Sequence, residues 1–410
     1  MSSDLILVTL ACAFAAYMAW MIGANDVANS MAPAIGSGYL SLKNAIIIAA
    51  VAEFSGAVLV GASVTSTIRK GIVDPAVFRG DLTLFILGMT AALFGAAAWL
   101  HAATYLGLPV STTHSIVGAV IGFGLIAKGA DALNAGVIAG IVLSWIISPV
   151  MGGLLGFGIF YFVREKILAA EDPEHASRRA APYIIFFVVV VLLQSFVFKG
   201  MKNLKLPVNF WSVLLFGIIV GAVVCAGARY YFKREGGKGS RDITNRLFTF
   251  LLITTSGYVA FAHGANDVAN AVGPLAAVLD VFRTGSLASK VPIPWWVLVL
   301  GGVGIVSGLW ISGWRVISTI GTRITEITPQ NGFSAQFGAA TTVLVFSQIG
   351  LPISTTHTIV GAVIGVGMAR GIGALNLRVI GSIISSWLLT LPFAAGATML
   401  TFRLLQIALL

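Results

Sequence analysis

Charge is scarce in this chain, since Asp, Glu, Lys and Arg together make up 10% of its 410 residues. A soluble globular domain carries about 25% charged residues, so this composition excludes an ordinary soluble protein. Apolar residues make up 58% of the chain, and stretches such as 82–101 and 136–162 contain no charged residue. Apolar segments of about 20 residues are typical of transmembrane helices. The sequence therefore predicts an all-α polytopic protein embedded in a lipid bilayer.

Cysteines and catalytic motifs are also few. The two cysteines, Cys12 and Cys225, lie in apolar runs, which favours small core residues over a disulfide or a thiolate metal site. No Walker motif, glycine-rich nucleotide loop or nucleophile arrangement occurs, so we expect no enzyme activity and no organic cofactor. The net charge of +10 lies in loops between apolar runs, where it indicates membrane topology and not nucleic-acid binding.

An internal repeat is the strongest feature that the sequence does contain. GANDVAN at 23–29 recurs at 264–270, and LPVSTTHSIVGAVIGFG at 108–124 recurs as LPISTTHTIVGAVIGVG at 351–367. The motifs follow one another in the same order in both halves of the chain. We therefore expect two repeat units joined by a segment of two helices with basic loops, over residues 1–163, 246–410 and 164–245 respectively.

The number of apolar segments predicts how the two units are oriented. The second unit starts seven crossings after the first, and an odd number means that the units face opposite ways. This predicts an inverted-topology repeat with half-helix or re-entrant elements at its core. The basic loops 164–181 and 229–246 are expected to be cytoplasmic, with both termini outside. About twelve crossings are predicted, at 4–28, 41–66, 83–106, 110–127, 132–163, 183–198, 207–229, 246–268, 294–319, 333–350, 353–369 and 375–402.

The repeated Asn-Asp motif indicates a cation site. Asp26 and Asp267 lie between apolar segments, and carboxylates at membrane depth usually mark ion or substrate paths. Neighbouring Asn side chains supply the oxygen ligands that hard cations prefer. Sodium fits this donor set, and the predicted ligands are Asp26, Asn29, Asp267 and Asn270.

The repeated Ser-Thr-Thr-His motif indicates an oxyanion site. Proline followed by clustered hydroxyl residues predicts a helix N-terminus, where free N–H groups and the helix dipole attract anions. Inverted repeats can aim two such ends at one anion. Two ionised Asp and a monoanionic substrate would carry about −3, against about +0.5 from each helix end, so bound cations are expected. The predicted anion ligands are Ser111, Thr112, Thr113, Ser354, Thr355 and Thr356.

Four further polar residues are assigned less directly. Glu53 is a lone carboxylate in the middle of its span, and we expect it to bind an additional sodium with Gln336. The matching positions in the other unit, Ile305 and Leu84, are apolar, and a protonated Glu53 bonded to a backbone carbonyl is the alternative. His114 and His357 follow the hydroxyl triplets, where they could act in gating or proton transfer or be structural.

These motifs together resemble the inorganic phosphate transporter (PiT) family over nearly the whole chain. The resemblance implies a secondary transporter, a homodimer, with the hydroxyl triplets, Asn25, Asp26, Asn266 and Asp267 lining the phosphate and cation sites. We assign Asn25 and Asn266 to phosphate. The short loop 229–246 resembles prokaryotic members, which implies the plasma (inner) membrane.

Three functions remain open from the sequence. The first is sodium-coupled symport of inorganic phosphate into the cell, with Na⁺ as the co-transported ion. The second is proton-coupled phosphate transport or sulfate transport by the same fold. The third is a passive anion channel, which the two carboxylates beside the anion site disfavour because they would repel the permeant ion.

Overall fold

The chain is helical throughout the residues that the structure describes. The computed structural model describes residues 3–61, 72–73, 75–197, 209–234, 243–287, 293–348 and 353–409, so Pro352, the proline of the second hydroxyl motif, lies outside them. Within these ranges no strand occurs, and Val73 and Leu133 form an isolated bridge. Each predicted crossing corresponds to a helix. The helices are α1 (Ser3–Gly36), α2 (Leu42–Val60), α3 (Leu82–Tyr105), α4 (Thr112–Lys128), α5 (Ala135–Val163), α6 (Pro173–Ser195), α7 (Phe210–Arg234), α8 (Ile243–Thr284), α9 (Trp295–Ser312), α10 (Trp314–Ser318), α11 (Pro329–Gln348), α12 (Thr355–Arg370) and α13 (Leu377–Leu409).

Nine of the described helices are long and apolar enough to cross a membrane, which makes this a multi-pass membrane protein. They are α1, α2, α3, α5, α6, α7, α8, α9 and α13. Two others, α4 and α12, have 17 and 16 residues. At 1.5 Å per residue they are about 25 Å long, less than the roughly 30 Å of a bilayer core. The number of twelve crossings remains a prediction.

The helices that carry the Asn-Asp motif extend further than predicted. The expected crossings end at residues 28 and 268, whereas α1 continues to Gly36 and α8 to Thr284. Both helices contain a proline after the motif, Pro33 and Pro274. The helices continue because the polar side chains find partners in other helices, while the following residues are small and buried. A continuous helix also keeps backbone groups bonded inside the membrane.

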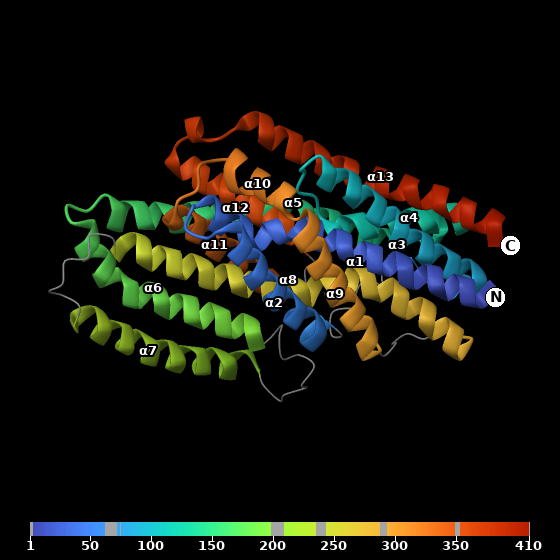
Figure 1. Ribbon diagram of the computed structural model, residues 1–410, viewed down its shortest axis with the longest axis horizontal. Coiled ribbons are helices and arrows are strands. Elements are labelled where there is room, and N and C mark those ends of the chain that lie inside the picture. Colours follow the sequence, from blue (N-terminus) through green and yellow to red (C-terminus); the bar gives the residue numbers. More distant parts are fainter. Residues whose placement is uncertain are drawn as a thin grey trace.

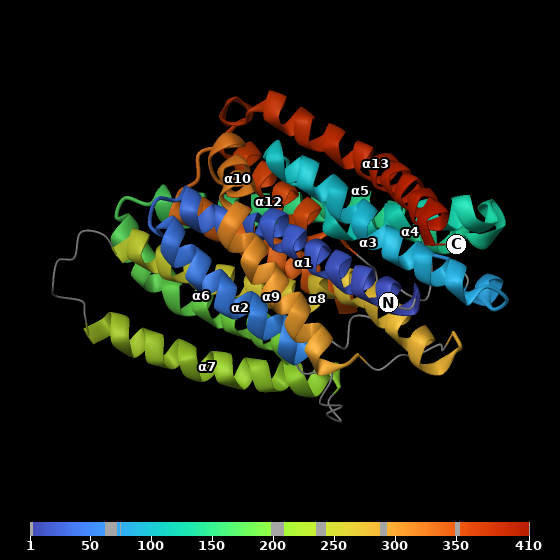
Figure 2. The ribbon, with the colours of Figure 1, turned by 45° about the vertical axis from the view of Figure 1, so that its right-hand side comes forward.

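Helices of the two halves pack against each other in matching pairs. α1 packs on α9 and α8 packs on α2, whereas α5 packs on α12 and α11, and α13 packs on α4 and α3. A Cβ added at Gly23 would lie 1.8 Å from the carbonyl oxygen of Ile305, and one at Gly264 would lie 2.1 Å from that of Glu53. Only glycine permits these approaches. α1 and α8 run in opposite directions, and α6 and α7 lie together at one edge (Figures 1 and 2).

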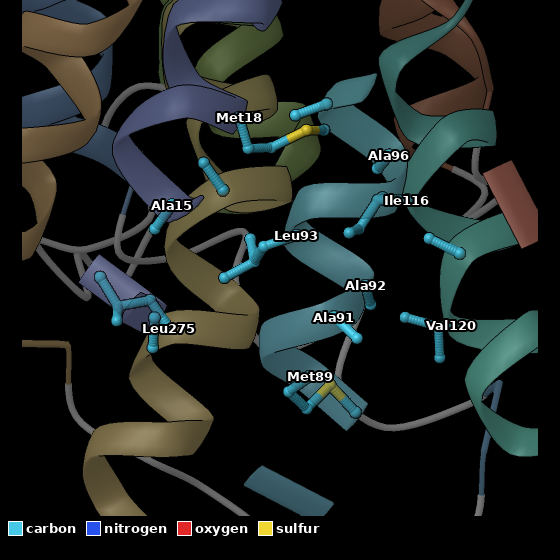
Figure 3. Packing of buried hydrophobic residues seen from close by; sticks show 14 of the residues in the cluster. Ala15, Met18, Met89, Ala91, Ala92, Leu93, Ala96, Ile116, Val120 and Leu275 are labelled. Carbon is cyan, nitrogen blue, oxygen red and sulfur yellow. The ribbon is translucent and has the colours of Figure 1, made fainter. Parts of the chain in front are cut away.

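The apolar core extends between helices of both halves. One cluster joins α1, α3 and α4 to α8, and Figure 3 shows Leu93 of α3 between labelled side chains of the neighbouring helices. A second cluster joins α1 and α2 to α8, α11 and α12. The polar side chains of the repeated motifs, such as Asp26, Thr112, Asp267 and Thr356, are buried together with these clusters.

Candidate functional site

The hydroxyl triplets begin two short helices inside the protein. Ser111 Oγ accepts a hydrogen bond from the backbone N–H of His114 at 3.3 Å, and Ser354 Oγ accepts one from His357 at 3.2 Å. Both serines are therefore N-caps, and each is only 2% exposed. The prediction that these motifs are helix N-termini is confirmed for α4 and α12. The two serine oxygens serve the caps, which leaves the threonines to face the site.

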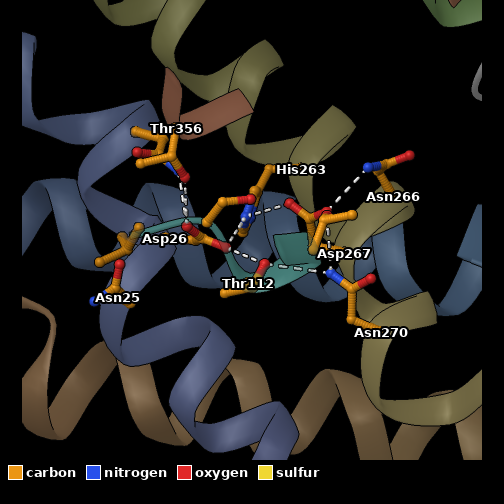
Figure 4. A network of polar contacts seen from close by, with 12 residues as sticks. Asn25, Asp26, Thr112, His263, Asn266, Asp267, Asn270 and Thr356 are labelled. Carbon is orange, nitrogen blue, oxygen red and sulfur yellow. Dashed lines mark hydrogen bonds and ion pairs between the residues drawn. The ribbon is translucent and has the colours of Figure 1, made fainter. Parts of the chain in front are cut away.

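Asp26 connects the two triplets. Its carboxylate accepts hydrogen bonds from Thr112 Oγ1 at 2.6 Å and from Thr356 Oγ1 at 3.0 Å, one on each oxygen (Figure 4). Asn29 Nδ2 donates to the same carboxylate at 2.9 Å. The Asp26 side chain is fully buried, so these donors replace the water that would otherwise solvate it.

The second Asn-Asp motif faces the triplets in a similar way. Asn270 Nδ2 donates to Thr112 Oγ1 at 3.2 Å and to Thr113 Oγ1 at 3.3 Å. Asn29 of the first motif donates to Thr356 Oγ1 at 2.9 Å, so each motif reaches the triplet of the other half. Asp267 Oδ1 accepts from Asn266 Nδ2 at 2.9 Å. The structure thus brings the predicted residues of both halves into one polar centre.

His263 lies at the middle of this centre, a position that we did not predict. Its Nε2 is 2.7 Å from Asp267 Oδ2 and 3.4 Å from Asp26 Oδ2, and its Nδ1 is 3.2 Å from Glu53 Oε1. The signal was present in the sequence. His263 directly precedes the second GANDVAN, whereas Ile22 precedes the first, so this position breaks the repeat where it is otherwise identical.

Negative charge dominates the centre. One imidazole faces three carboxylates, those of Asp26, Glu53 and Asp267, and all four side chains are at most 2% exposed. No Lys or Arg among the described residues lies within ion-pair distance of them. One ligand atom from each of Asp26, His263 and Asp267 lies within 4.8 Å of the others, a spacing that suits a bound cation. Buried charge of one sign requires compensation, which a cation would supply.

Glu53 and Gln336, which we expected to form a separate sodium site, have different described partners. Glu53 faces His263, whereas Gln336 Nε2 donates to the carbonyl oxygen of Ser30 at 2.6 Å. Gln336 Oε1 and Asn29 Oδ1 are buried, and neither accepts a described hydrogen bond. Two buried amide oxygens that accept no described hydrogen bond lie near one turn of α1. They favour a bound hard cation, because such a cation is coordinated by oxygen atoms.

The sequence pairing of Gln336 also requires correction. FGAA occurs at 94–97 and again at 337–340, which pairs Gln336 with Leu93 and not with Leu84. Contacts agree with this register, because a Cβ on the glycine of the first FGAA would meet α13 at Thr398, and one on the second would meet α5 at Gly156. Gln336 therefore still has an apolar equivalent, so it remains a feature of one half only.

Asn25 holds a loop in place. Its Oδ1 accepts from the backbone N–H of Val110 at 3.1 Å, and its Nδ2 donates to Thr104 Oγ1 and to the carbonyl oxygen of Leu108, both at 3.0 Å. These bonds fix the chain that leads into α4. The predicted role of Asn25 in anion binding is therefore better described as positioning the anion-facing helix end.

His114 and His357, the histidines that follow the hydroxyl triplets, contact each other, and each packs on a tryptophan. The rings of His114 and His357 are 4.4 Å apart, centroid to centroid, in a T-shaped contact between α4 and α12. His114 packs on Trp145 at 3.8 Å, and His357 stacks on Trp387 at 3.7 Å. His114 thus links α4 to α5, and His357 links α12 to α13, so each histidine joins a triplet-bearing helix to the long helix that follows it. This aromatic contact fixes the distance between the two triplet-bearing ends.

Comparison with known proteins finds similarity over nearly the whole chain. The profile of the phosphate transporter family matches residues 22–398. A candidate phosphate permease of Pyrococcus abyssi is 46% identical over 391 residues, which cover 95% of this chain and 96% of that protein. The inorganic phosphate transporter 2-1, chloroplastic, of Arabidopsis thaliana is 41% identical over 410 residues, covering 94% of this chain and 70% of its own length.

A solved structure described as the sodium-dependent phosphate transporter has the same fold. It is 40% identical in sequence, superposes with a TM-score of 0.88, and covers 98% of this chain and 99% of its own. The resemblance inferred from GANDVAN and the hydroxyl triplets is thus confirmed. A buried polar centre made from both repeats, in a multi-pass helical protein with this similarity, shows that the chain belongs to the phosphate transporter family and is a transporter, not an enzyme.

Proposed function

We propose that this protein is a secondary transporter that carries inorganic phosphate into the cell together with sodium. The observation that carries the proposal is the cluster of three buried carboxylates around His263, with no described Lys or Arg to balance them. Adding a phosphate anion to this centre is unfavourable unless cations enter with it. Binding of the anion is then conditional on binding of the cation, which is the basis of coupling.

Sodium is the favoured cation because of the donors that surround Asp26. The buried oxygens of Asn29 and Gln336 lack hydrogen-bond donors, and a monovalent hard cation can use such neutral oxygens together with a carboxylate. A proton would satisfy a carboxylate but not amide oxygens. The similar protein of solved structure is described as sodium-dependent, which supports the same choice here.

The hydroxyls of Thr112 and Thr356 connect the cation to the anion. Both now donate to the Asp26 carboxylate. A cation beside Asp26 would compensate its negative charge, so the carboxylate would need these two hydrogen bonds less. The hydroxyls could then donate to a phosphate at the N-terminal ends of α4 and α12. The dipoles of the two helices add favourable partial charge at the same place.

The architecture proposed for transport is an inverted repeat of twelve crossings in the prokaryotic plasma membrane. It is supported by the opposite directions of α1 and α8 and by the matching contacts of the two halves. Short α4 and α12 would be the half-helices, and the units would span residues 1–163 and 246–410. The basic loops 164–181 and 229–246 would be cytoplasmic. A homodimer is expected from the family resemblance, and the mass of the protein in detergent would test it.

The test of the function is uptake into proteoliposomes. Purified protein is reconstituted, and uptake of radiolabelled phosphate is measured under an inward sodium gradient, under an inward proton gradient, and with potassium on both sides. We expect accumulation only with the sodium gradient, and weak competition by sulfate. Accumulation driven by protons alone would support the proton-coupled alternative, and equilibration without either gradient would support a channel.

A further inference from the structure

A small cavity adjoins one side of the polar centre. It lies between α1, α6, α8, α11 and α12, has a volume of about 30 Å³, and is lined in part by Asn29, His263 and Asn266 of the centre. One water needs about 10–15 Å³ measured in this way, so the cavity has room for water but not for a phosphate. Its walls are made largely of small side chains, such as Ala262 and Ala340.

Contacts between the two halves occur in pairs that the repeat relates to each other. They identify which residues occupy the position equivalent to the cavity on the other side of the centre. A Cβ at Gly118 would meet Leu391, and one at Gly361 would meet Pro149, the two contacts being related by the repeat. When the two GANDVAN motifs are aligned, the cavity residues of α8 correspond to residues of α1. Tyr258, Val259 and Ala262 correspond to Tyr17, Met18 and Met21.

The equivalent place is filled by larger side chains. Met18 and Met21 stand where the cavity has Val259 and Ala262, and Leu100 stands where it has Val343. Met18, Met21 and Leu100 are at most 2% exposed. Met18, Ala96 and Ile116 lie together in the packed core, whereas their equivalents line the cavity (Figure 3). The two sides of the centre are thus chemically alike at the site and different beyond it.

The cavity lining at Tyr258 also differs from its equivalent. Tyr258 hydrogen-bonds to Ser195 at the end of α6, a helix that belongs to neither repeat. On the other side the hydroxyl of Tyr17 is 2.8 Å from His101 Nδ1. His263, which also lines the cavity, corresponds to the apolar Ile22 on the other side.

We propose that the cavity is the narrow, closed form of the passage through which phosphate and its cations leave the centre. Tyr258 and Ser195 form its gate. Met18, Met21 and Leu100 form the seal of the opposite passage, where flexible methionine side chains can repack when that side opens. This inference rests on the transport function proposed above. It assigns the gated passage to the side of the centre where the end of α6 meets α8, α11 and α12.

Filling the cavity tests its role as a passage. Ala262→Met introduces the side chain that stands at the equivalent position, and Thr254→Met places the same side chain on an exposed position of α8 as a matched control. We expect equilibrium phosphate binding in detergent to stay within about threefold of wild type in Ala262→Met, while phosphate exchange in proteoliposomes falls by about tenfold or more. Thr254→Met should change neither. Wild-type exchange in Ala262→Met, or loss of binding along with exchange, would overturn the assignment.

A thiol-labelling experiment tests the same assignment without any substrate. Single cysteines are placed at Ala262→Cys and Met21→Cys in a chain that carries Cys12→Ala and Cys225→Ala, and a membrane-impermeant thiol reagent is added without phosphate or sodium. The cysteine at 262 should react at least about tenfold faster than that at 21, because residue 262 lines the cavity whereas residue 21 is packed in the core. Equal rates would refute the asymmetry. This result is independent of sodium coupling, which the wild-type uptake measurement reports separately.

Discussion

The contact between Glu53 and His263 makes a prediction about stability that needs no assumption about transport. The two side chains are 0% and 1% exposed, with Glu53 Oε1 3.2 Å from His263 Nδ1. Removing one partner of a buried pair costs about 3–5 kcal/mol, because the other charge is left without compensation. His263→Ile should therefore destabilise the protein by about this amount, since Glu53 then has no described partner. Glu53→Ile should cost much less, because His263 still faces two aspartates.

The double variant Glu53→Ile/His263→Ile should be more stable than His263→Ile alone. Two isoleucines already occupy the equivalent positions of the other half, Ile305 and Ile22, and both are fully buried. The repeat therefore shows that an isoleucine pair can be packed in this arrangement. We expect an interaction energy of about 2–3 kcal/mol in a double-mutant cycle. Thermal unfolding in detergent, followed by tryptophan fluorescence in sodium-free buffer, measures it. As a control, Ile305→Val should cost only about 0.5–1.5 kcal/mol. Strictly additive effects of the two substitutions would refute the pairing.

Four other substitutions test the centre and its frame. Asp26→Asn removes a carboxylate that accepts three hydrogen bonds, and uptake should lose its sodium stimulation while the protein still folds; sodium-dependent uptake at the wild-type level would contradict the cation role. Thr356→Val deletes a donor to a charged group worth about 1.5–3 kcal/mol, so we expect phosphate affinity, measured by equilibrium binding, to fall about 10- to 100-fold. Gln336→Leu should raise the sodium concentration for half-maximal uptake and leave phosphate binding at saturating sodium unchanged. Gly264→Ala places a Cβ 2.1 Å from a backbone oxygen of α2 and should sharply reduce the yield of folded protein on size-exclusion chromatography.

Sequence reasoning predicted most of the helices because apolar length is a strong signal and lipid leaves few alternatives. It placed the ends of α1 and α8 too early, because polar residues such as Asn25 and Asp26 suggest a break when their partners are unknown. The partners of Asn25 lie at the end of α3 and in the loop before α4, and those of Asp26 include Thr112 and Thr356, which no local pattern reveals. The same holds for the apolar segments beyond the motifs, whose burial depends on the opposite half.

The centre itself was predicted in part. Repetition identified the Asn-Asp and hydroxyl motifs, because duplicated polar residues in an apolar chain are rare. His263 was not predicted as a site residue because it occurs in one copy only, so the repeat does not mark it. Pairing Glu53 with Gln336 was a guess from shared asymmetry, whereas the contact that Glu53 makes is with the other asymmetric residue beside the motif.

The bond from Thr356 to Asp26 spans 330 residues of sequence. A ribosome that adds about 5–20 residues per second needs roughly 20–70 seconds to make that length of chain. During this time α1 is already in the bilayer, and the Asp26 carboxylate lacks the hydrogen bond that Thr356 later donates. Water or the insertion machinery has to accommodate that side chain until α12 arrives. The last crossings therefore complete the folding of the first, and a chain truncated before Thr355 would present the cell with a permanently unfinished helix that quality-control proteases can recognise.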